Sequence, residues 1–169
     1  YPPEKLARGL ELVTVSWRRP ALDALDPRVK SLNYLNNAMA KLEARRQGAD
    51  EALILNTGGT IAEASVANVF ALRGRALATP PPTDGALEGV TRRSVLELAP
   101  GLGLAASERS LSRVDLLGAD EVFLTGTGAG IVPVRSLDGQ TIGAGEPGPG
   151  FARVRGAFLA MTKTHGVPF

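Results

Sequence analysis

Residues 121–134 read EVFLTGTGAGIVPV and combine two short apolar runs with a glycine-rich centre. The runs EVFLT (121–125) and IVPV (131–134) have the length and β-branched content of buried strands. The segment between them, Gly126-Thr127-Gly128-Ala129-Gly130, lets the backbone turn and brings its N–H groups close to a ligand. It matches neither the dinucleotide-binding fingerprint nor the Walker A pattern. The stretch therefore predicts a strand–loop–strand unit whose loop is either an anion-binding loop or a simple turn.

The rest of the chain supplies further strands and several helices around this unit. Residues 32–47 carry apolar side chains three and four apart and predict an amphipathic helix, with Leu32, Leu35, Met39 and Leu42 as its apolar positions. Helices are also expected over 91–98, 113–117 and 151–163, and strands over 10–17, 51–55, within 60–72, and over 76–79 and 104–111. The pattern indicates a mixed α/β (α+β) fold with a barrel-like β-sheet and flanking helices.

Composition excludes several classes of function. The chain has 169 residues, of which 44% are hydrophobic and 21% charged, as in one ordinary globular domain. Its net charge of +2 and its scattered basic residues argue against nucleic acid or an anionic membrane surface as a partner. There is no cysteine and a single histidine, His165, so no disulfide, thiolate chemistry or metal site is expected. No apolar stretch of about 18 residues predicts a membrane span, and the expected location is cytoplasmic.

Two ionisable residues lie in unusual surroundings. Lys30 comes just before the predicted helix over 32–47, among apolar and small neighbours. Such surroundings lower the pKa of an amine and make it available for a Schiff base, although most loop lysines are simply exposed. Glu63 lies in the apolar run IAEASVANVFAL (61–72). If it is buried it needs a cationic or hydrogen-bonding partner, such as a protonated pyridine nitrogen; otherwise it is a half-exposed strand residue.

A candidate phosphate site lies in the segment LEGVTR (87–92). A glycine followed by a helix start leaves backbone N–H groups free at the positive end of the helix dipole. Thr91 adds a hydroxyl donor, and Thr127 in the glycine-rich loop can add another. The arrangement suits a phosphate, and the alternative is that Thr91 only caps the helix.

Four segments together resemble, in order and in spacing, the motifs of the class IV (fold type IV) pyridoxal-phosphate-dependent aminotransferases. They are VKSLNYLNN (29–37), IAEASVANVFAL (61–72), LEGVTR (87–92) and FLTGTGAGIVPV (123–134). That family includes branched-chain aminotransferases, D-amino-acid aminotransferases and aminodeoxychorismate lyases. The resemblance runs from about Trp17 to near the C-terminus. It implies that pyridoxal 5'-phosphate is the cofactor and that Lys30 holds it as an aldimine and then moves the substrate proton.

The resemblance also assigns roles to the other site residues. Glu63 would pair with the pyridine nitrogen, Tyr34 would lie near the phenolic oxygen, and Leu87 would pack on the ring. The phosphate contacts would come from Val90, Thr91 and Thr127, and the substrate carboxylate would meet Gly128 and Ala129. Several branched-chain members carry a glutamate where this chain has Gly130, so the substrate side stays open.

The implied activity is transamination between an amino acid, branched-chain or related, and a 2-oxo acid. Two alternatives remain: an aminodeoxychorismate lyase-type elimination with the same lysine, and a catalytically inert fragment that keeps only the fold. Family members generally form homodimers and carry a smaller N-terminal domain that completes the site. Residues 1–169 contain no match to that domain, so we expect a single large cofactor-binding domain with a site open on one side.

Overall fold

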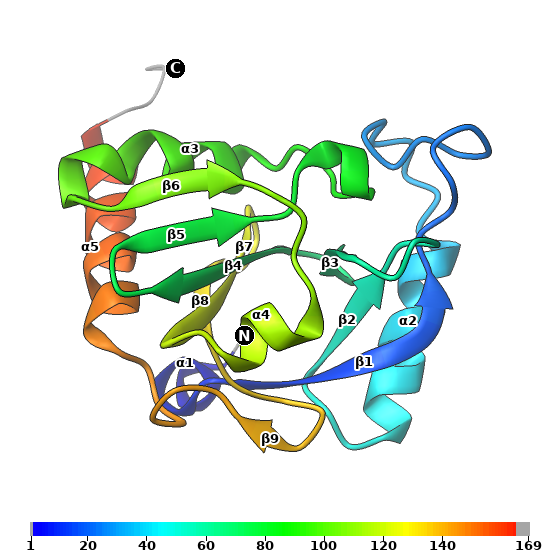
Figure 1. Ribbon diagram of the computed structural model, residues 1–169, viewed down its shortest axis with the longest axis horizontal. Coiled ribbons are helices and arrows are strands. Elements are labelled where there is room, and N and C mark those ends of the chain that lie inside the picture. The colour runs from blue at the N-terminus through cyan, green and yellow to red at the C-terminus, as the bar shows by residue number, and fades with distance from the viewer. Residues whose placement is uncertain (1, 165–169) are drawn as a thin grey trace.

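The computed structural model describes residues 2–164, so His165 lies outside the described residues. One strongly curved sheet dominates it, with the strand order β3-β2-β1-β8-β7-β4-β5-β6 and β9 paired to β8 (Figure 1). The strands are β1 (Leu10–Arg18), β2 (Glu51–Leu55), β3 (Ile61–Ala64), β4 (Asn68–Arg73), β5 (Ala76–Thr79), β6 (Ala105–Glu108), β7 (Glu121–Gly126), β8 (Gly130–Leu137) and β9 (Gln140–Thr141). The predicted mixed fold with a barrel-like sheet is confirmed.

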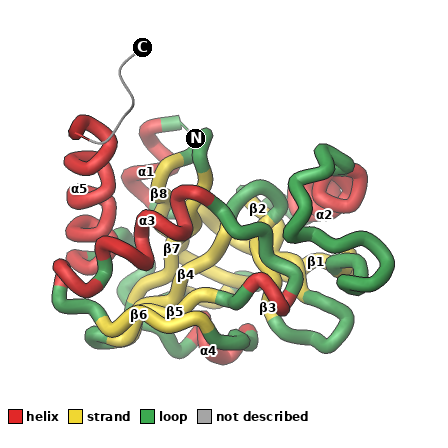
Figure 2. Tube along the Cα trace, turned by 90° about the horizontal axis from the view of Figure 1, so that it is seen from above, coloured by secondary structure: helices red, strands yellow, loops and turns green. Residues whose placement is uncertain are grey.

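Helices lie around the sheet, with α2 and α5 on opposite sides of it (Figure 2). They are α1 (Pro3–Arg8), α2 (Leu35–Arg46), α3 (Val90–Leu98), α4 (Arg113–Leu117) and α5 (Pro149–Thr164), with short 3-10 turns η1 (Pro82–Asp84) and η2 (Pro100–Leu102). Helix α2 packs against β1 and β2, whereas α3 and α5 contact each other and β7. None of the helices within residues 2–164 is long and apolar enough to cross a membrane.

The stretch 121–134 forms the predicted pair of strands, β7 and β8, and lies at the centre of the sheet. Strand β7 pairs antiparallel with β4 on one side and with β8 on the other. Val122 and Leu124 enter one hydrophobic cluster, whereas Phe123 enters another and stacks on Phe70 with ring centroids 5.2 Å apart. Because successive side chains point to opposite faces, both faces of β7 are covered, which explains its continuous apolar run.

Several local features differ from the sequence-based expectation: the helix predicted over 32–47 begins only at Leu35, and the strand predicted over 104–111 is shorter, at Ala105–Glu108. The predicted strand within 60–72 is two strands, because the chain turns at residues 65–67 so that β3 pairs with β2 and β4 pairs with β7. Helix α1 and strand β9 were not predicted, since each is too short to show a period.

Helix α2 buries a different face from the one its leucines mark. Leu35 is 70% exposed and Leu42 40% exposed, whereas Ala40 and Ala44 are fully buried. The two alanines pack with Ile54 of β2 in a small cluster. Small side chains let the helix lie close to the sheet.

Candidate active site

A cavity of about 420 Å³ lies where the loop before α2, the turn between β3 and β4, the start of α3 and the turn between β7 and β8 meet. Of the residues predicted from the sequence it is lined by Lys30, Tyr34, Glu63, Leu87, Val90, Thr91, Thr127 and Gly128. These residues come from four separate segments, and the fold brings them together. Ala129 does not line the cavity; it packs against the core cluster that contains Leu124.

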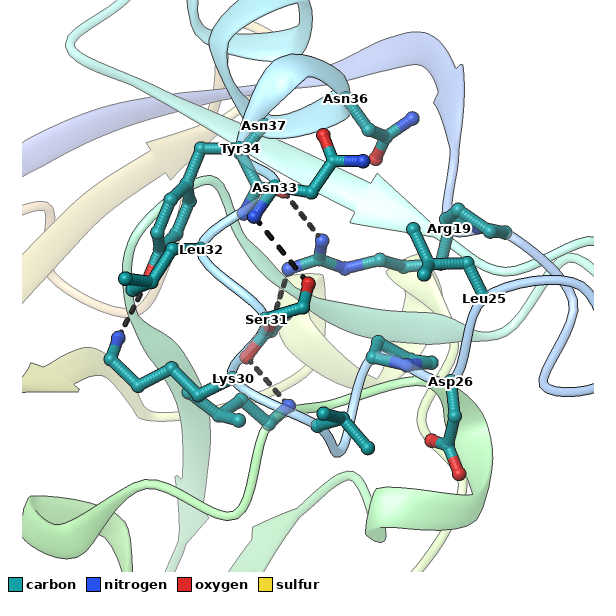
Figure 3. Close-up of a pocket in the computed structure, with 15 residues that line it drawn as sticks. Arg19, Leu25, Asp26, Lys30, Ser31, Leu32, Asn33, Tyr34, Asn36 and Asn37 are labelled. Atoms are coloured by element: carbon teal, nitrogen blue, oxygen red, sulfur yellow. Dashed lines mark hydrogen bonds and ion pairs between the residues drawn. The ribbon is translucent and has the colours of Figure 1, made fainter.

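A second, smaller cavity of about 60 Å³ adjoins the first and is lined mainly by residues 19–37 (Figure 3). The two cavities share the side chains of Lys30, Tyr34, Asn37, Glu63 and Leu87. The lysine and the buried carboxylate therefore face one continuous hollow with two branches.

Lys30 and Tyr34 form a close pair at the mouth of this hollow. The Lys30 Nζ donates to the Tyr34 Oη at 2.5 Å and lies 5.2 Å from the centre of the tyrosine ring. Figure 3 shows both side chains reaching toward each other, Lys30 from the loop before α2 and Tyr34 from the residue just before the helix. Both side chains are exposed, so the amine is open to a small molecule that enters the cavity.

Glu63 is buried, with 6% of its surface exposed, and every oxygen of its carboxylate has a donor. Oε1 accepts from the guanidinium of Arg19, and Oε2 accepts from Asn68 Nδ2 at 2.9 Å and from the Leu87 backbone N–H at 3.1 Å. Burial raises the pKa of Glu63 to about 7, against the attraction of Arg19 and the hydrogen bond from Leu87, which lower it. A carboxylate has about four lone-pair sites, so three donors leave room for one more.

The start of α3 offers free donors to the same cavity. The N-cap is Gly89, in an extended conformation and without a side-chain cap, so Thr91 does not cap the helix. Thr91 is 3% exposed and lines the cavity, as does Thr125, whose buried Oγ1 has no hydrogen-bond partner within the described chain. A Cβ on Gly89 would lie 2.2 Å from the Asn68 Oδ1, so a larger residue here would force the Asn68 amide to move. Free N–H groups and hydroxyls at a helix N-terminus suit a phosphate.

The lining residues that were not predicted include four polar ones that bear on the site: Arg19, Asn37, Asn68 and Thr125. The requirement of a buried Glu63 for a cation was visible in the sequence, but nothing indicated which of the 19 basic residues would supply it. Asn68 had a signal of its own, because an amide between Ala67 and Val69 in a buried strand needs a partner. Among residues 2–164 no group of three or more His, Asp or Glu side chains could hold a metal ion.

Comparison with known proteins identifies the family. The sequence model of the family described as amino-transferase class IV matches residues 1–137. The chain belongs to this family. It is 40% identical over 159 residues to the branched-chain-amino-acid aminotransferase of Escherichia coli, covering 94% of this chain and 52% of the relative. The chain spans about half the length of the curated relatives it matches.

Solved structures agree with this assignment. The branched-chain amino acid aminotransferase of Escherichia coli superposes with a TM-score of 0.91 at 40% identity, over 95% of this chain and 53% of the other. The branched-chain amino acid aminotransferase from Thermobaculum terrenum, solved in its PLP-form (holo-form), gives a TM-score of 0.88 at 38% identity, over 93% and 52%. The fold is therefore that of the branched-chain aminotransferases.

Proposed function

We propose that residues 1–169 form a single cofactor-binding domain of a pyridoxal-phosphate-dependent aminotransferase. It would transfer an amino group between a branched-chain or related amino acid and a 2-oxo acid. The observation that carries this proposal is the shared cavity: an exposed amine (Lys30), a buried carboxylate (Glu63) and the uncapped start of α3 line it together. The related proteins and solved structures are branched-chain aminotransferases, which supports the same activity.

The residues present fit pyridoxal phosphate. The amine of Lys30 would hold its aldehyde carbon, Glu63 would use its fourth lone-pair site for the ring nitrogen, and Leu87 would pack on the ring. The phosphate would bind at Val90 and Thr91, with Thr127 beside them and the orphaned Thr125 hydroxyl as a further donor. When bound, the cofactor supplies the electron sink for reactions at the α-carbon of an amino acid.

The chain's own groups then account for proton movement and substrate placement. The Lys30 Nζ, once free, is the base that takes the α-proton and returns it, and the Tyr34 hydroxyl at 2.5 Å orients that amine. Gly128 presents its backbone at the cavity wall, next to Thr127, where a substrate carboxylate would meet N–H groups. Ala129 does not line the cavity, so a contact of its backbone with the carboxylate would require the turn after Gly128 to move toward the substrate.

The cofactor site is tested by chemical trapping. The protein is mixed with pyridoxal phosphate, reduced with borohydride, digested, and mapped by mass spectrometry. We expect the label on Lys30 and its loss in Lys30→Ala, with Lys163→Ala, at an exposed position of α5, as the matched control. Label spread over many lysines, or no label, would refute the proposed site.

The substrate class is tested by product analysis. Leucine, isoleucine and valine are each incubated with a 2-oxo acid, and the new amino acid and 2-oxo acid are measured. We expect amino transfer at matched rates for both products, because the reaction conserves the amino group. Release of pyruvate from aminodeoxychorismate would instead indicate the lyase, which the named relatives do not favour.

We also propose a homodimer and a cytoplasmic location, both from the family resemblance. Exposed apolar side chains around the cavities support further protein contact: Leu32 is 70% exposed, Leu35 70%, Val66 62% and Val90 61%. Light scattering would test the dimer, and a mass of one chain at micromolar concentration would refute it. Cell fractionation would test the location.

A further inference from the structure

Helix α2 carries a stripe of polar side chains on the face that meets the sheet. Tyr34 precedes the helix, and Asn37 and Lys41 follow three and four residues later, on the same face. Tyr34 meets Lys30, Asn37 meets Arg19, and Lys41 Nζ meets the fully buried Glu51 at 2.6 Å. Helix α2 and the residue before it thus contact both the Lys30 amine and Arg19, the cation that pairs with Glu63.

The amide of Asn37 can adopt only one orientation. Its Oδ1 accepts from Arg19 Nη1 at 2.8 Å, and its Nδ2 donates to the Ser65 backbone carbonyl at 2.6 Å. A flipped amide would point its N–H groups at a guanidinium and its oxygen at a carbonyl, and both contacts would be repulsive. Asn37 therefore fixes Arg19 relative to the turn between β3 and β4, which lines the cavity.

Arg19, whose position is fixed by Asn37, in turn binds the Glu63 carboxylate. Its guanidinium donates through Nη1 to Asn37 and through Nη2 to the carboxylate, and 6% of the residue is exposed. The Nε of Arg19 has no partner among the described residues, so these two contacts define its position. Ser65 is itself held at its hydroxyl by Glu51, which pairs with Lys41.

We infer that Asn37 and Arg19 are positioning residues that hold the Glu63 carboxylate in place and favour its charged form, through contacts anchored on α2. The inference rests on the proposed function, because the orientation of Glu63 matters for catalysis only if it meets a cofactor. Removing the Asn37 amide frees the guanidinium to turn away, and the buried carboxylate then loses part of its counter-charge. Arg92 is the other cation whose charge favours ionised Glu63, and it does not depend on Asn37.

The test measures the ionisation of Glu63 directly, in the protein without cofactor. Glutamate labelled with ¹³C at its carboxyl is incorporated, and the Glu63 signal is assigned by its absence in Glu63→Gln. We expect Asn37→Ala to raise the pKa of Glu63 by about one unit, a tenfold drop in its ionisation constant. Arg19→Lys keeps the charge but not the fork of donors, and we expect a rise of similar size.

Asn36→Ala is the matched control. Asn36 is the neighbouring residue of the same type on the same helix, and its Nδ2 donates to the Arg18 carbonyl at 3.0 Å rather than to Arg19. We expect the pKa of Glu63 in this variant to match the wild type. An unshifted pKa in Asn37→Ala, or an equal shift in Asn36→Ala, would overturn the inference. Since no cofactor is present, this result is independent of whether Lys30 is labelled in the trapping experiment.

Discussion

Substitution Glu63→Gln removes a buried carboxyl whose pKa is raised from 4.5 to about 7 by burial. Between these values the folded protein keeps a proton that the unfolded chain has released, so the free energy of unfolding falls as the pH rises. At about 1.36 kcal/mol per unit, the decrease is about 3 kcal/mol across this window. The contribution of Glu63 is fully present below pH 4.5 and is lost by about pH 7. Glutamine does not titrate, so the variant lacks this component.

The assay is urea unfolding of the cofactor-free protein at several pH values between about 4 and 8, a range that spans the window between the two pKa values. The quantity compared is the difference in unfolding free energy between wild type and Glu63→Gln, which cancels the contributions of other groups. We expect this difference to change by about 3 kcal/mol in favour of the variant as the pH rises. Glu88→Gln, at an exposed position nearby, should reproduce the wild-type slope. A difference that is constant with pH would show that Arg19 keeps Glu63 ionised throughout and would refute the reasoning.

Three further predictions follow from single contacts. Tyr34→Phe removes the hydroxyl 2.5 Å from the Lys30 Nζ, and we expect kcat to fall by about 100-fold with little change in unfolding free energy; a change within twofold would contradict the role of the hydroxyl. Glu121→Ala removes a carboxylate that accepts from two backbone N–H groups at the start of α5, and urea unfolding should show a loss of about 1–2 kcal/mol rather than none. Phe123→Ala leaves a hole beside Phe70 and should cost about 3–5 kcal/mol by the same assay; a loss under about 1 kcal/mol would mean that the core collapses into the space.

The sequence predicted the central strands well because their signal is local. The apolar run of β7 and the glycine-rich turn after it depend on neighbouring residues, and both lie where expected. The buried face of α2 could not be predicted in this way. Its leucines have helical spacing but are exposed, and its contact with the sheet depends on Ala40 and Ala44 fitting against β1 and β2. Which face of a helix is buried depends on the elements that pack against it. The spacing of apolar residues along the sequence does not show which elements these are.

In the candidate site, too, the features that depend on nearby residues could be predicted and those that depend on distant residues could not. Lys30 and Glu63 could be proposed from the sequence because the four motifs around them occur together in the order and spacing of a known family, whereas each residue alone was ambiguous. The partner of Glu63 could not, because Arg19 lies 44 residues away along the chain. The contact exists only once β1 and β3 lie on either side of β2. Long-range pairs of this kind are set by the sheet order, and a single sequence does not reveal it.

That sheet order also has a consequence for how the chain is made. Strand β1 lies between β2 and β8 and is parallel to both, and its contacts with β8 join residues 124 positions apart. At a synthesis rate of about 5–20 residues per second, β8 leaves the ribosome about 6–25 s after β1. For that time one edge of β1 has unpaired N–H and C=O groups, open to other chains. We expect misassembly during synthesis to begin at this edge, and faster translation to reduce it.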